Sequence, residues 1–191
     1  MWFVTLWNEG WPALGFGVVI AASAAASCTD LLARRIPNWL TFPLAAAGAI
    51  NAFAVAGFAG LADGVTAAIL ISVPFLIQFM LGRGGAGDAK LMMAIGLWLG
   101  TIAGLAALAA VAMCGCVVAI ITMIAQRRSA EVCTNVMVAA HQTVLAVSTA
   151  GVFRPCPAAE ANPGARFTMP YAPAILLGVI ATAIGVSSWR V

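Results

Sequence analysis

Six acidic side chains occur in the 191 residues of this chain, and two of them stand where an acid is costly. Asp30 lies in an apolar run, about 6 Å below Arg34 along a helix. Asp88 follows a glycine-rich stretch and begins another apolar run. An ionisable group inside a membrane is expensive, so its default interpretation is functional. Two carboxylates that meet can activate a water for hydrolysis. The other acidic residues fall in loops or at the ends of runs: Glu9, Asp63, Glu131 and Glu160.

Each aspartate also has a purely structural interpretation. Asp30 could pair with Arg34, one turn further along the same helix. Asp88 could cap the start of its helix after the glycine turn. The two apolar runs are expected to cross the membrane in opposite directions, so both aspartates should lie at the same depth in it. This shared depth and the neighbouring glycines favour a catalytic pair. We expect Asp88 to be the base, because a helix N-terminus favours an anion, and Asp30 the acid near a C-terminus. The reverse assignment stays open, because such a pair titrates as a unit.

The residues around Asp88 also predict contacts with a substrate. Gly85 and Gly87 have no side chains, so an extended peptide backbone could approach Asp88 closely. The alternative is a flexible connector between two apolar runs. Lys90 could attract acidic groups of a substrate, or it could anchor its helix among lipid head groups.

The composition decides which elements must position these side chains. Hydrophobic residues make up 63% of the chain and charged residues 8%, with a mean hydropathy of +1.05. A soluble domain carries roughly a quarter charged residues. Apolar runs recur at about the 20 residues that cross a bilayer, without the alternation of barrel strands. Only helices and closed barrels satisfy their backbone in lipid, so the sequence predicts an all-α integral membrane protein.

We predict a single domain, 1–191, built as a bundle of six transmembrane helices. With both termini outside, every basic residue except Arg190 lies on the cytoplasmic side, as the positive-inside rule requires. A segment at 126–168 is expected at the cytoplasmic interface; a seventh span there is the alternative, against the charge rule. The predicted spans are about 12–33, 38–58, 62–81, 88–100, 102–125 and 170–188.

The remaining composition predicts no cofactor and no metal site. Five cysteines form no C-x-x-C pair, and a single histidine completes no zinc set. The basic residues stand singly or in pairs at the ends of apolar runs, which predicts contact with the bilayer and none with nucleic acid.

Two motifs resemble those of the type IV prepilin peptidases, membrane aspartic proteases of the GxGD class. Residues 85–91 (GAGDAKL) match the family's GxGDxKL motif. Residues 30–38 (DLLARRIPN) match its first aspartate, followed by a basic patch and Ile-Pro-Asn. Residues 169–175 (MPYAPAI) are similar to the proline-containing start of the family's last helix. The resemblance covers essentially the whole chain from Ala21 onward.

This resemblance implies that Asp30 and Asp88 are the catalytic pair of a peptidase in the bacterial inner membrane. It also implies a substrate, the leader of a prepilin or pseudopilin, cut on the cytoplasmic side before a hydrophobic segment. Larger family members carry a cytoplasmic insertion with two C-x-x-C pairs and N-methylate their product. The sequence lacks that insertion, so we expect a small peptidase of tight-adherence (Flp-type) pili without methyltransferase activity. The oligomeric state is left open.

Two other functions use the same features. A small proton-coupled transporter would also bury acids, but it predicts acids near the midplane and inverted repeats, and neither is visible here. An inactive subunit of a pilus-assembly machine could retain the fold, and a cleavage assay separates it from an enzyme.

Overall fold

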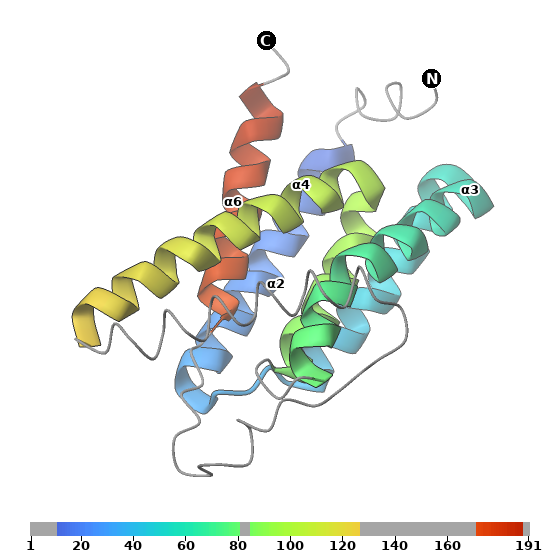
Figure 1. Cartoon of the computed structure of the whole chain (residues 1–191). Helices are drawn as coiled ribbons and strands as arrows, with labels where there is room; N and C mark the ends of the chain where they lie inside the picture. Colours follow the sequence, from blue (N-terminus) through green and yellow to red (C-terminus); the bar gives the residue numbers. More distant parts are fainter. Residues whose placement is uncertain (1–10, 81–84, 127–170, 189–191) are drawn as a thin grey trace, which may run out of the picture.

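The computed structural model describes residues 11–80, 85–126 and 171–188, and the regular structure in these ranges is entirely helical (Figure 1). This confirms the all-α prediction for the described part of the chain. The predicted interfacial segment, 126–168, lies almost wholly outside it. The helices are α2 (Trp11–Ala33), α3 (Asn38–Met80), α4 (Ala86–Gln126) and α6 (Ala172–Ser188).

Helix α3 is a helical hairpin rather than one rod. A straight helix of its 43 residues would be about 65 Å long, twice the thickness of a bilayer core. The backbone breaks at Ala56 and Gly57, and Gly57 has φ 60°, a conformation open to glycine at little cost. Beyond the break, a β-carbon at Gly64 would lie 3.5 Å from that of Ala52, so the two arms run side by side (Figure 1).

Helix α4 changes direction at Gly100, which has φ 70° and ψ −177°. Its first arm packs against both arms of α3, because Gly48 and Gly64 leave room for Trp98 and Leu97. Its second arm runs across the molecule toward α6 (Figure 1), where Val111 fills the space beside Gly178.

The break at Gly100 falls at the end of the predicted span 88–100, whereas the break at Ala56 and Gly57 falls inside the predicted span 38–58, close to its end. The described residues thus form α2, two arms of α3, two arms of α4, and α6. Among the described residues, three helices are long and apolar enough to cross a membrane: Leu14–Ala33, Asn38–Met80 and Ala86–Val118. Helix α6 contributes a shorter apolar stretch, Ala172–Val186. The number of six membrane crossings stays a prediction.

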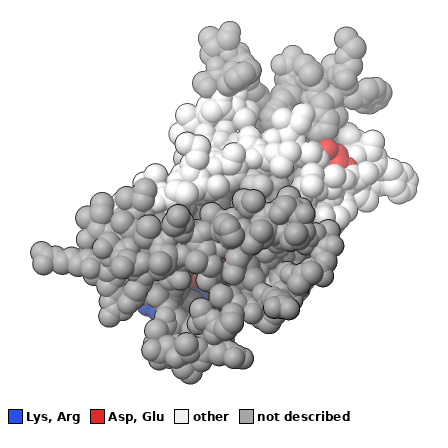
Figure 2. All heavy atoms as spheres, viewed as in Figure 1, with Lys and Arg blue, Asp and Glu red and all other residues white. Residues whose placement is uncertain are grey.

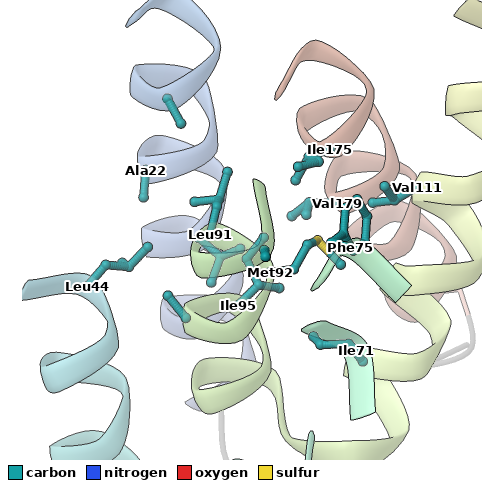
Figure 3. Close-up of a cluster of buried hydrophobic side chains, with 14 residues drawn as sticks. Ala22, Leu44, Ile71, Phe75, Leu91, Met92, Ile95, Val111, Ile175 and Val179 are labelled. Atoms are coloured by element: carbon teal, nitrogen blue, oxygen red, sulfur yellow. The ribbon is translucent and has the colours of Figure 1, made fainter. Parts of the chain in front are cut away.

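The core forms where the described helices meet around the first arm of α4. Leu91, Met92 and Ile95 are fully buried there, as are Ile71 of α3 and Ile175 of α6. Figure 3 shows these side chains converging with others from α2, α3 and α6. The core thus holds the start of α4, and Asp88 with it, between α2, α3 and α6.

The outer surface is apolar as well. Large side chains such as Leu32, Trp39 and Phe58 are more than two-thirds exposed, at 88%, 72% and 81%. Figure 2 shows the described surface on one face almost free of charge, with acidic atoms near one end and basic atoms near the other. An exposed apolar surface of this extent fits a lipid environment.

Candidate active site

Asp30 is held at the end of α2 by a tight turn. Helix α2 ends at Ala33, and Arg34 adopts a left-handed conformation, φ 50°, which is uncommon for a residue with a side chain. Its backbone N–H donates to the carbonyl of Asp30 at 2.8 Å. Pro37 then starts α3, since its carbonyl accepts the N–H of Leu40. The predicted turn before Asn38 is therefore present, and Asp30 lies beneath it with 9% of its surface exposed.

Asp88 lies in the first turn of α4. Its backbone N–H donates to the carbonyl of Gly85 at 3.2 Å, and the helix begins at Ala86. Gly85 therefore occupies the N-cap position and Asp88 the third helical position, from which its carboxylate accepts the backbone N–H of Gly85. Asp88 is not the N-cap residue itself, but it does help to cap the start of α4. The Asp88 side chain is half-buried near the positive end of the helix dipole, which stabilises an anion.

The two carboxylates lie within electrostatic range of each other across the fold. Asp30 and Asp88 lie on different helices and are separated by 58 positions in the sequence, yet they interact electrostatically in the folded protein. Like charges that lie close together in a partly desolvated site oppose each other. Such a pair offers one acceptor and one donor of protons, the combination that hydrolysis of a peptide bond requires.

Helix α6 supplies a third element, which the sequence analysis did not place at the site. The backbone N–H of Ala172 donates to Oδ2 of Asp30 at 3.3 Å. Tyr171 directly precedes Ala172 at the same end of the helix. The sequence signals here were the apolar span predicted at 170–188 and the segment 169–175, which resembles the start of the family's last helix; neither placed this helix beside the aspartates. Every residue except proline carries a backbone N–H, so the sequence does not mark which residue donates to Asp30.

The two glycines of the GxGD motif lie in different environments. Gly85 is exposed, and a β-carbon there would lie 3.1 Å from Oδ2 of Asp88. A side chain at this position would therefore crowd the carboxylate. A β-carbon at Gly87 would lie 2.8 Å from that of Ile36, so Ile36 fills the space that a side chain would need. Substrate contact at either glycine stays a prediction.

Lys90 reaches the start of α3. Its Nζ donates to Oδ1 of Asn38 at 2.9 Å and lies 5.4 Å from the centre of the Phe42 ring. These contacts tie the first turns of α3 and α4 together, next to Asp88. Contact of Lys90 with a substrate stays a prediction.

Asp63 has a structural partner at the other end of α4's first arm. Its Oδ2 accepts the backbone N–H of Thr101 at 3.1 Å, and its carbonyl accepts the Thr101 hydroxyl at 3.3 Å. Thr101 begins the second arm of α4, so Asp63 caps that arm directly after the break at Gly100. The site lies about 20 Å along the helix from Asp88.

Comparison with known families agrees with this arrangement. The sequence model of the family described as type IV leader peptidase matches residues 17–123, more than half of the chain, including both aspartates. Comparisons with curated proteins and with solved structures found no match. The family match supports a leader peptidase-like function in general terms, and with the apolar helices it indicates a membrane protein. On this evidence the chain belongs to the type IV leader peptidase family.

Proposed function

We propose that the chain is a membrane aspartic endopeptidase that removes the leader of type IV prepilins or pseudopilins of the Flp type. The observation that carries the proposal is that Asp30 and Asp88, from separate helices, lie within electrostatic range of each other, one buried and the other half-buried. Family membership supports the same class of reaction. The Flp-type substrate rests on the resemblance of the sequence to small peptidases without a cysteine-rich insertion.

The reaction we propose is a direct attack of water on the scissile carbonyl. The ionised aspartate takes a proton from a water molecule, and the resulting hydroxide bonds to the carbonyl carbon. The protonated aspartate gives its proton to the carbonyl oxygen. The tetrahedral intermediate then breaks the C–N bond, and a proton passes to the leaving amine. One water is consumed, and the products are a new carboxyl terminus and a new amino terminus. Paired carboxylates perform these steps without a metal or a cofactor.

We propose a site at the cytoplasmic face of the bacterial inner membrane, with both termini outside. Arg34, Arg35 and Lys90 lie beside the two aspartates in the sequence, and basic residues favour the cytoplasmic side. The substrate helix would lie in the bilayer against the exposed apolar side chains, with its leader reaching the aspartates. The leader must be extended there, because a helix keeps its carbonyls in its own hydrogen bonds.

Co-expression with a Flp-type prepilin tests the proposal, with the mobility shift of the prepilin on a gel as the readout. The wild-type chain should process the prepilin, whereas Asp30→Asn and Asp88→Asn should abolish processing without loss of membrane insertion. Asp63→Asn is the matched control, because it makes the same change about 20 Å from Asp88 and keeps an acceptor for Thr101.

Substantial cleavage by either variant of the pair would end the proposal. Absence of cleavage by the wild-type chain, inserted normally beside several Flp-type prepilins, would favour an inactive assembly subunit.

A further inference from the structure

The first residue of α6 contacts the carboxylate of Asp30 in the interior of the protein. The backbone N–H of Ala172 donates to Oδ2 of Asp30 at 3.3 Å, across 142 positions of sequence. Ala172 is fully buried, and Asp30 is 9% exposed. A hydrogen bond in such surroundings is little weakened by water.

The start of α6 leaves this N–H available. The carbonyl of Tyr171 accepts the N–H groups of Ala174 and Ile175, at 3.0 and 3.2 Å, so Tyr171 is the N-cap residue. Ala172 is then the first helical residue, and the N–H groups of a helix's first turn have no acceptor within the helix. Asp30 supplies the missing acceptor from α2.

The Tyr171 side chain fixes where this helix begins. Its ring packs edge to face against Phe75 of α3, with centroids 5.7 Å apart and planes at 68°. Its hydroxyl end fits against Gly115 of α4, where a β-carbon would overlap the tyrosine oxygen. Tyr171 is therefore clamped between α3 and α4, and Ala172 follows it directly.

We infer that Tyr171 and Ala172 are positioning residues of the peptidase: Tyr171 docks the start of α6, and the Ala172 N–H orients the Asp30 carboxylate. The inference rests on the proposed function. The hydrogen bond from Ala172 also limits which oxygen of Asp30 can carry a proton. A protonated carboxyl group accepts a hydrogen bond best through its carbonyl oxygen, so Oδ2 stays the acceptor for Ala172. Any proton that Asp30 holds is then on Oδ1, the oxygen left for water, Asp88 or the substrate.

Two substitutions at one position test the backbone donor. Ala172→Pro removes the N–H, and proline suits the first position of a helix, where its fixed φ is already helical. Ala172→Gly keeps the N–H and changes only the side chain. With purified full-length protein and a Flp-type prepilin in detergent, we expect Ala172→Pro to lower kcat by about 10- to 100-fold. KM should change by less than about two-fold, and Ala172→Gly should stay close to wild type.

A second pair tests the clamp and leaves both aspartates and the Ala172 N–H in place. Gly115→Ala places a β-carbon against the Tyr171 hydroxyl and should lower kcat by shifting the start of α6. Adding Tyr171→Phe removes that hydroxyl, which should restore part of the lost rate. A variant that harmed only global packing would not be rescued in this way. If Ala172→Pro fails to accumulate in the membrane, Gly115→Ala and its combination with Tyr171→Phe test the inference on their own.

The outcomes separate this inference from the proposed function. If Asp30→Asn and Asp88→Asn abolish cleavage while folded Ala172→Pro cleaves at the wild-type rate, the backbone donor has no positioning role. Unchanged kcat for Gly115→Ala contradicts the clamp. If the aspartate variants themselves cleave, the peptidase mechanism fails first. A loss of kcat in Ala172→Pro but not in Ala172→Gly supports the inference.

Discussion

Gly87 and Ile36 are packed so closely that a β-carbon on Gly87 would lie 2.8 Å from the β-carbon of Ile36. Ile36 belongs to the turn that follows Asp30, and Gly87 directly precedes Asp88. The contact therefore joins the two motifs that carry the aspartates. A glycine at this position lets the start of α4 approach the turn between α2 and α3.

Gly87→Ala should push α4 away from that turn and move Asp88 relative to Asp30. Displacements near 1 Å at a catalytic site cost up to about 100-fold, so we expect kcat for prepilin cleavage to fall by about 10-fold or more. Steady-state kinetics distinguishes a packing role of Gly87 from a role in making room for the substrate. A rise in KM with kcat unchanged would instead show that Gly87 makes room for the substrate.

Gly96→Ala should destabilise the packing of α4 on α3. A β-carbon there would lie 2.7 Å from the backbone Cα and N of Ala68, which cannot turn aside as a side chain can. We expect a loss of about 1–3 kcal/mol in unfolding free energy, measured by thermal unfolding in detergent. Gly17→Ala is the matched control, because nothing lies within 4 Å of its β-carbon position. Equal stability of the two variants would contradict the close packing.

Asp63→Ala should destabilise the protein while leaving its chemistry unchanged. It removes the acceptor for the part-buried N–H of Thr101, and an unsatisfied donor costs about 1–3 kcal/mol. Asp63→Asn retains an acceptor oxygen and should lose less. Both variants should keep the kcat of the wild type. A fall in kcat for both, at a temperature where they stay folded, would instead connect this distant acid to catalysis.

Lys90→Met tests whether this lysine anchors helices or binds the leader. Its hydrogen bond to Asn38 is exposed, so we expect a stability loss of no more than about 1 kcal/mol. As an anchor, Lys90 contributes little to the reaction, and KM for a prepilin should change by less than about three-fold. A larger rise in KM, absent in Asn38→Ala, would establish contact between Lys90 and the substrate.

The sequence alone predicted helices as the regular structure and a turn near Gly100, and it singled out Asp30 and Asp88 as the candidate acids. Apolar runs long enough to cross a bilayer favour helices, because a helix satisfies its own backbone in lipid. Pro37, Gly57 and Gly100 stand where the chain turns. These features are local, because composition and backbone freedom act over a few residues. The placement of Asp30 just before the predicted turn followed from the same local rules.

Only the tertiary structure decided what surrounds those acids. Asp30 meets Ala172, Tyr171 fits against Gly115, and Asp63 caps the arm that begins at Thr101. Each pair joins residues from different helices. In two of them a carboxylate binds a backbone N–H, which nearly every residue carries, so no residue type marks the partner in the sequence. The packing of whole helices selects which N–H faces the carboxylate, and that choice exists only once the bundle has formed.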